Sequence, residues 1–186
     1  MLMPPDVGQP VHPSDALTVT LSGGTAEVDA GCFGIYYTDL PGTAAKLHSW
    51  GDISGAIQNI KPVEVDFTTS ATAAVWNDTV ITTTENLLKA DTWYAVLGYL
   101  TDTAVLCMGI RAPETGNLRI CGPGPTSTFR TDNYFIYMAG HRGVPYIPTF
   151  NANNRGGVFL SAAAVATSTA VKGSLILAEL ASSFVG

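Results

Sequence analysis

The chain has 186 residues, and only 13 % of them are charged, about half of the ~25 % usual in globular domains. The formal net charge is −6 and the nine Lys and Arg residues are scattered, which argues against direct binding to nucleic acid. No apolar run approaches the ~20 residues that cross a bilayer, so we expect no membrane partner. The sequence start also lacks the basic and apolar regions of a signal peptide. A surface this poor in charge favours contact with other subunits, although a neutral domain rich in Thr and Ser gives the same composition.

The first 15 residues predict an extended arm. They contain Pro4, Pro5, Pro10 and Pro13 and show no helical or strand periodicity. Proline fixes φ and removes a backbone donor, so this density disfavours a helix. We expect the arm to lie across a neighbouring subunit, with these four prolines at the interface. Residues 16–186 are then expected to form a single domain.

Short strands are expected along the part of the chain before residue 92. The candidates are residues 16–21, 32–37, 63–69, 73–76 and 79–83. The strand at 63–69 alternates apolar with polar side chains, and the last two are expected to form a hairpin around the turn dipeptide Asn77-Asp78. Residues 43–59 predict a long loop with a helical turn.

Residues 92–125 predict the centre of the fold. Three apolar runs, at 93–99, 104–111 and 117–121, are separated by short segments rich in Pro, Gly, Asp and Asn. This pattern is typical of an antiparallel meander. The first two runs are apolar at nearly every residue, so we expect both of their faces to be covered.

The last third of the chain predicts strands at 134–139, 158–166 and 171–180 around a long loop at 140–157. About ten short strands and essentially no helix predict an all-β protein, an antiparallel β-sandwich. A jelly roll is the expected topology, preceded by the Pro-rich arm.

No catalytic motif is present in the sequence. GxSxG, P-loop, HExxH, CxxC and dinucleotide fingerprints are all missing, so we expect no enzyme activity, no cofactor and no metal. The histidines are isolated, and the cysteines lie in apolar runs as expected for buried thiols, although a disulfide between the last two cysteines stays open. The three histidines are His12, His48 and His141, and the three cysteines are Cys32, Cys107 and Cys121.

The segment 144–154, VPYIPTFNANN, is the candidate interface loop. Two prolines stiffen it, and Tyr146, Ile147 and Phe150 supply apolar anchors. Asn151, Asn153 and Asn154 supply donors and acceptors that suit a subunit interface around a symmetry axis. Two alternatives stay open. The segment is either a structural loop whose Asn side chains form hydrogen bonds with the local backbone, or a sugar-binding edge.

The core segments YAVLGY (94–99), GIRAPETGNLRI (109–120) and GSLILAEL (173–180), together with the Pro-rich arm, resemble the single jelly-roll proteins of icosahedral viruses and bacteriophages. The resemblance implies a structural virion protein, namely a capsid decoration or cement protein. It also implies a homotrimer that binds a capsid shell protein and is made in the host cytoplasm. No Lys or Arg precedes Lys46, which favours an outer cementing role over contact with the genome.

Three alternatives to the cementing role stay open. The first is a small jelly-roll major coat protein. The second is a carbohydrate- or receptor-binding module that would use Trp50, Trp76, Tyr146 and the Asn loop. The third is an enzyme on a jelly-roll scaffold, such as a cupin-type metal enzyme, for which the chain lacks the expected spacing of His ligands.

Overall fold

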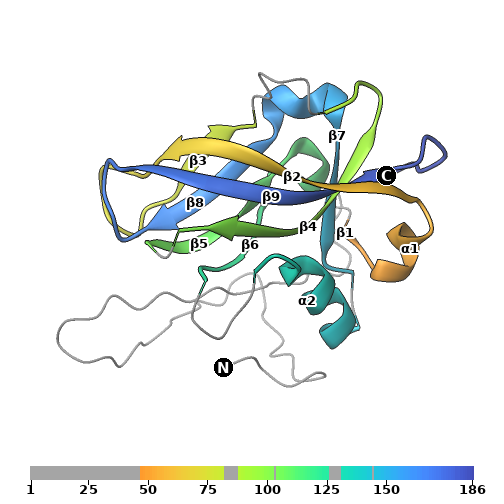
Figure 1. Ribbon diagram of the computed structural model, residues 1–186, viewed down its shortest axis with the longest axis horizontal. Helices are drawn as coiled ribbons and strands as arrows, with labels where there is room; N and C mark the ends of the chain where they lie inside the picture. Colours follow the sequence, from red (N-terminus) through yellow and green to blue (C-terminus); the bar gives the residue numbers. More distant parts are fainter. Residues whose placement is uncertain (1–46, 82–87, 103, 126–130, 144) are drawn as a thin grey trace, which may run out of the picture.

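A computed structural model describes residues 47–81, 88–102, 104–125, 131–143 and 145–186. These residues form two packed β-sheets with two short α-helices at one side (Figure 1). The elements in chain order are β1 (Leu47–His48), α1 (Trp50–Ser54), β2 (Ile57–Thr68), β3 (Asn77–Val80), β4 (Trp93–Thr101), β5 (Val105–Arg111), the 3₁₀ turn η1 (Pro113–Thr115), β6 (Arg119–Pro123), α2 (Tyr134–Arg142), β7 (Ile147–Asn151), the 3₁₀ turn η2 (Ala152–Gly157), β8 (Phe159–Ala164) and β9 (Ala170–Leu180).

The strand order confirms the predicted antiparallel sandwich and its jelly-roll topology. Sheet I has the order β1-β7-β4-β9-β2, and sheet II has the order β3-β8-β5-β6. Counted from β2 to β9, the first strand pairs with the last, the second with the seventh, the third with the sixth and the fourth with the fifth, all antiparallel. Such nested pairing is one long hairpin wrapped into two sheets, which is a jelly roll.

The predicted three-strand meander is only partly right. β5 and β6 form the expected hairpin, and its turn contains Gly116 and Asn117 in the left-handed region. β4, however, lies in sheet I between β7 and β9, whereas β5 and β6 lie in sheet II. The connection after Thr101 therefore crosses from one sheet to the other. The apolar pattern marks each strand but carries no information on its partner.

The strand predicted at 134–139 is wrong, because this segment is the helix α2. The side chains of Tyr134, Phe135, Met138 and Ala139 are buried, while Tyr137 is exposed, and that spacing is helical. The helix ends at Gly143, whose φ of 65° is the left-handed conformation of a C-terminal cap. Aromatic and β-branched composition suggested a strand, but packing of α2 against β4 and β7 stabilises the helix.

Two other local predictions need correction. Asn77-Asp78 lies inside β3, which pairs with β8 rather than forming the expected hairpin. The loop expected at 140–157 contains β7 and η2. The helical turn expected within 43–59 is confirmed as α1, where Ser49 and Asp52 form a capping box.

Several predictions lie outside the described residues. They concern the arm at 1–15 with Pro4, Pro5, Pro10 and Pro13, the strands at 16–21 and 32–37, and Cys32. Of the predicted strand at 79–83, residues 79–81 are described, and the first two of them are the end of β3, whereas the predicted strand at 73–76 is turn and irregular chain.

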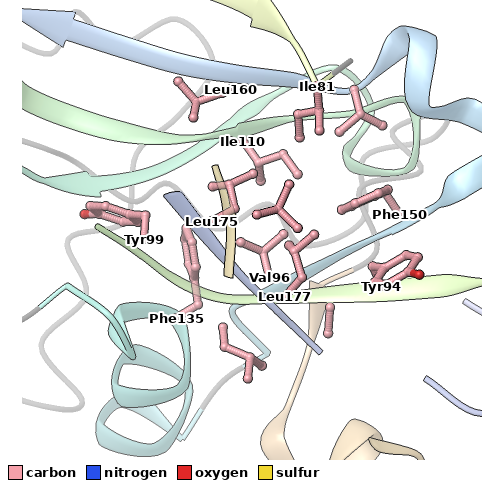
Figure 2. Packing of buried hydrophobic residues seen from close by; sticks show 14 of the residues in the cluster. Ile81, Tyr94, Val96, Tyr99, Ile110, Phe135, Phe150, Leu160, Leu175 and Leu177 are labelled. Atoms are coloured by element: carbon pink, nitrogen blue, oxygen red, sulfur yellow. The ribbon is translucent and has the colours of Figure 1, made fainter. Parts of the chain in front are cut away.

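The core lies between the two sheets, and large apolar side chains fill it (Figure 2). On β2, Val63, Val65 and Phe67 are buried as the alternation predicted. β2 is an edge strand of sheet I, a position that tolerates its Pro62. The rings of Tyr94 on β4 and Phe150 on β7 stack with their centroids 5.8 Å apart.

Candidate functional site

The Asn residues of the predicted interface loop lie at one end of the sandwich, which we call the loop end. The connections β3–β4, β5–β6 and β7–β8 meet there. Asn151 caps the 3₁₀ turn η2, since its side chain accepts a hydrogen bond from the Asn153 amide at 2.9 Å. This geometry explains why an Asn-rich stretch follows β7: Asn side chains readily accept bonds from backbone two residues on.

Hydrogen bonds tie the loop-end connections together. Asn153 Nδ2 donates to Asp91 Oδ1 at 2.6 Å, and the Asp91 amide donates back to Asn153 Oδ1 at 3.1 Å. Asn154 Nδ2 donates to Glu114 Oε1 at 2.8 Å, and this same oxygen accepts from the Asn151 amide. The three Asn side chains therefore hold η1, η2 and the turn before β4 in one arrangement. These bonds agree with the structural-loop alternative; contact of the same residues with a second copy stays a prediction.

The apolar anchors of the predicted interface loop, including Ile147, are part of the protein interior. Phe150 is fully buried, and Tyr146 is nearly so. Tyr146 packs against Tyr134 and Phe135 of α2, with ring centroids about 6 Å apart. In the single chain, both side chains thus stabilise the fold instead of lining an open surface.

Replacing Asn153 with Asp is expected to destabilise the loop end. The new carboxylate would face Asp91 at hydrogen-bond distance, which removes a donor and places like charges together, at a cost of about 1–2 kcal/mol in free energy of unfolding. Asn133→Asp is the matched control, because Asn133 precedes α2 without a side-chain capping bond and a negative charge there favours the helix. Thermal unfolding of both variants checks this. Equal melting temperatures for the two variants would contradict the role of Asn153.

Glu179 forms a second polar cluster at the loop end. Its carboxylate accepts a hydrogen bond from Lys89 Nζ, and Lys61 Nζ lies 4.0 Å from its other oxygen. Lys61 also lies over the Tyr94 ring, 5.1 Å from the centroid. Glu179 is buried and lines a pocket of about 250 Å³ with Asp91 and residues at the C-terminal end of β9. The sequence carried a signal for this residue that our prediction missed: a lone charge inside the apolar run of residues 173–180.

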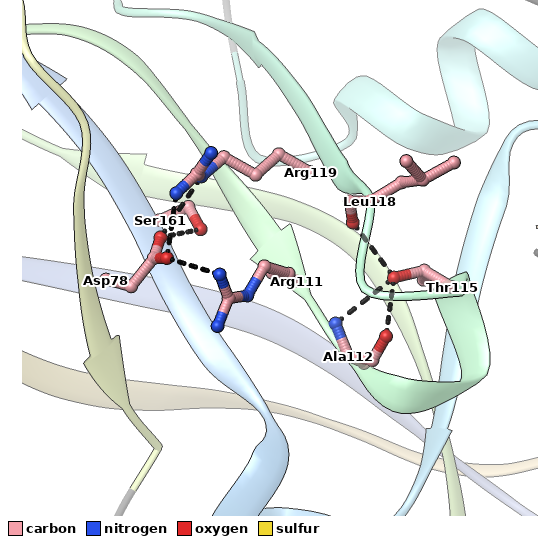
Figure 3. Close-up of polar contacts among 7 residues, drawn as sticks. All are labelled: Asp78, Arg111, Ala112, Thr115, Leu118, Arg119 and Ser161. Atoms are coloured by element: carbon pink, nitrogen blue, oxygen red, sulfur yellow. Dashed lines mark hydrogen bonds and ion pairs between the residues drawn. The ribbon is translucent and has the colours of Figure 1, made fainter.

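Two arginines share one carboxylate on the outer face of sheet II (Figure 3). Arg119 makes a bidentate contact with Asp78, and Arg111 Nη1 lies 3.0 Å from Asp78 Oδ2. The Ser161 hydroxyl also donates to Asp78. Burial by itself would raise the pKa of the Asp78 carboxyl, but the hydrogen bonds from Arg119 and Ser161 and the two arginine charges lower it below its ordinary value. Sequence reasoning missed this cluster because its members come from four separate strands.

Replacing Asp78 with Asn is expected to lower the free energy of unfolding by about 1–3 kcal/mol near neutral pH, since two guanidinium groups lose the negative charge and one of the two acceptor oxygens that they share. A carboxyl whose pKa is lowered by folding stabilises the protein above its unfolded pKa and loses that effect as pH falls through its folded pKa. The unfolded pKa is near 3.8. The difference in free energy of unfolding between wild type and variant should therefore be constant at neutral pH. It should shrink as the pH falls below the unfolded pKa of Asp78.

Urea unfolding of wild type and Asp78→Asn between about pH 2 and pH 7 measures this difference. Asp66→Asn, on an exposed position of β2, is the control and should change stability by less than about 0.5 kcal/mol. A difference that does not depend on pH would contradict the assignment.

The aromatic residues of the carbohydrate-binding alternative are not gathered into one exposed set. Trp50 is exposed on α1, whereas Tyr146 is buried behind α2. Trp76 is half-buried, with the Arg119 guanidinium 5.7 Å from its ring centroid. Tyr137 and His141 stack on the outward side of α2 with parallel rings 5.3 Å apart.

The structure also bears on the metal, disulfide and membrane features that the sequence raised. Within the described part of the chain, no group of three or more His, Cys, Asp or Glu side chains is arranged to hold a metal ion. Cys107 and Cys121 lie on adjacent strands and are not joined to each other by a disulfide. Among the described helices, none has the length and apolar character needed to cross a membrane.

Comparison of the chain with protein-family models, with curated proteins and with solved structures finds no match. The fold and the loop-end geometry therefore carry the functional argument by themselves.

Proposed function

We propose that the protein is a structural virion protein that oligomerises, as a trimer, and stabilises an icosahedral capsid as a decoration or cement protein. The observation that carries the proposal is the nested strand pairing from β2 to β9. It agrees with the resemblance of the sequence to single jelly-roll virion proteins. A fold alone does not define a function, so two surface features are needed as further support.

The first feature is an apolar strip on the outer face of sheet I. Ile60 on β2 and Leu100 on β4 are 52 % and 48 % exposed. Pro62 of β2 and Ile176 of β9 form a pair that lies between Ile60 and Leu100. The register of the strands places all four side chains on the same face of the sheet. Exposed aliphatic residues in one strip are typical of a subunit contact.

The second feature is the hydrogen-bonded loop end. Because Asn153, Asn154, Asp91 and Glu114 fix three connections relative to one another, this end presents one defined surface to a neighbour. A defined surface loses little conformational entropy on binding. Repeated on a closed shell, many weak identical contacts add to a large stabilisation through effective concentration.

The mass of the purified full-length protein in solution tests the proposal. Sedimentation equilibrium at micromolar concentration is expected to give a trimer or a larger closed assembly. The measurement is repeated at high salt, because contacts through apolar surface should survive the screening of charges. A monomer at all concentrations and salt levels would count against the proposal.

A further inference from the structure

Part of the outer face of sheet II is buried although it faces away from the core, while Arg111 and Arg119 on the same face keep 29 % and 37 % of their side chains exposed. Met108 and Ile110 on β5 point inward and belong to the core cluster, so their neighbour Cys107 points outward. Cys107 pairs with Ala163 of β8. Both are only 5 % exposed, and neither belongs to the core cluster. Groups outside the core cluster therefore shield these two side chains from solvent.

The same face carries an excess of positive charge. Arg111 and Arg119 share the single carboxylate of Asp78, which leaves one unit of positive charge. Each guanidinium group also lies over an aromatic ring, Arg111 over Phe159 at 4.6 Å and Arg119 over Trp76 at 5.7 Å. Arg111 Nε is buried and has no hydrogen-bond acceptor. A further acidic group on this face would complete the cluster.

The first 45 residues of the chain hold the complementary charge. They contain five acidic residues and no Lys or Arg, whereas residues 46–186 contain ten acidic and nine basic residues. Nearly all of the net negative charge thus lies before the described structure. The acidic residues are Asp6, Asp15, Glu27, Asp29 and Asp39.

The position where the described chain begins also suits contact with this face. β1 lies at the edge of sheet I next to β7. In a jelly roll the strands of the two sheets face each other in nested order, so the β7 side of sheet I lies opposite the β6 side of sheet II. The described chain therefore begins on the side of the sandwich where β6, which carries Arg119, forms the edge of sheet II. A stretch of 45 residues can extend well over 100 Å, far more than the width of four strands.

From these observations we propose that the outer face of sheet II, marked by Cys107, Ala163, Arg111 and Arg119, is the docking surface for the acidic N-terminal segment, residues 1–45, of the same molecule. The length of the segment and the side of the sandwich on which the described chain begins allow this contact within one molecule, which favours the same molecule over the neighbouring subunit expected from the proline-rich arm. The proposal goes beyond the role in a capsid and does not depend on it, because it concerns contacts within one chain.

Thiol labelling of the full-length chain tests the proposal, with Cys32 replaced by Ser so that Cys107 and Cys121 are the reporters. Neutralising the five acidic residues of the segment to Asn or Gln is expected to raise the labelling rate of Cys107 roughly tenfold, through loss of the attraction between the acidic segment and the surplus positive charge of Arg111 and Arg119. High salt should likewise raise the Cys107 labelling rate of the chain whose acidic segment is unaltered, because salt screens the charges. Glu64→Gln combined with Asp66→Asn, on β2 of the opposite sheet, is the control and should leave the rate unchanged.

Mass spectrometry of the labelled peptides identifies the reacting cysteine, and circular dichroism verifies that each variant is folded. Equal Cys107 rates in the neutralised and unaltered chains, at low and high salt, would overturn the proposal. A Cys107 rate that rises when the unaltered protein is diluted would show that a second copy supplies the segment, and would overturn the assignment to the same molecule. The oligomer mass is measured separately, so failure here leaves the proposed capsid role untouched.

Discussion

Replacing Phe150 with Ala is expected to lower the free energy of unfolding by about 3–5 kcal/mol, the usual cost of removing a buried aromatic ring. Phe150 is fully buried on β7 and stacks on Tyr94 of β4. β7 pairs with both β4 and β1, so the cavity would weaken sheet I where α2 also packs. Equilibrium unfolding in urea, with the slope of the transition compared between variants, measures the loss.

Tyr137→Ala is the matched control for Phe150→Ala. Tyr137 is 43 % exposed on α2, and its truncation should change stability by less than about 1 kcal/mol. Similar losses in the two variants would contradict the assignment of Phe150 to the core. The comparison also serves as a control for the sedimentation experiment. If the Phe150 variant fails to oligomerise, the cause is loss of folding and not loss of a subunit interface.

Replacing Gly98 with Ala is expected to have the second largest effect. A Cβ at Gly98 would lie 2.3 Å from the backbone carbonyl of Asp132, and this close approach leaves no room for a methyl group. The segment before α2 is held to β4 next to this point. The Tyr99 amide donates to Thr131 O at 2.9 Å, and the Thr131 hydroxyl donates to Tyr99 O at 2.6 Å. Separation of the two segments should cost about 1–3 kcal/mol or more.

Gly140→Ala provides a control of opposite sign. Gly140 lies inside α2, and a Cβ there would meet nothing within 4 Å. Ala is the better helix former, so this change should stabilise the protein by up to about 1 kcal/mol. Thermal unfolding followed by near-ultraviolet circular dichroism separates the two variants, because loss of α2 packing alters the environment of Tyr134 and Phe135. A Gly98→Ala protein as stable as wild type would contradict the close contact between β4 and the segment before α2.

Features encoded in short stretches of sequence were predictable. The alternation of Val63, Val65 and Phe67 with polar residues identified a strand with one buried face, and β2 has that face buried. The turn signals around Gly116 identified the β5–β6 hairpin. The all-β class and the jelly roll followed from many short strands separated by turn residues.

The candidate site was predictable only in part. The sequence drew attention to Asn151, Asn153 and Asn154, which do lie together at the loop end. Their partners Asp91 and Glu114 lie about 40 or 60 residues away in the chain, and no local pattern connects them. The same holds for Asp78 with Arg111 and Arg119, which meet only because β3, β8, β5 and β6 form one sheet.

The sequence by itself determined the all-β class, the strand β2 with one buried face and the β5–β6 hairpin, because these depend on patterns within a few neighbouring positions. Only the tertiary structure decided that β4 and β5 belong to different sheets and that residues 134–142 form a helix. The physical reason is that strand pairing and helix docking depend on contacts between residues far apart in the chain. Local propensities of a fraction of a kcal/mol per residue yield to several kcal/mol of burial in the core.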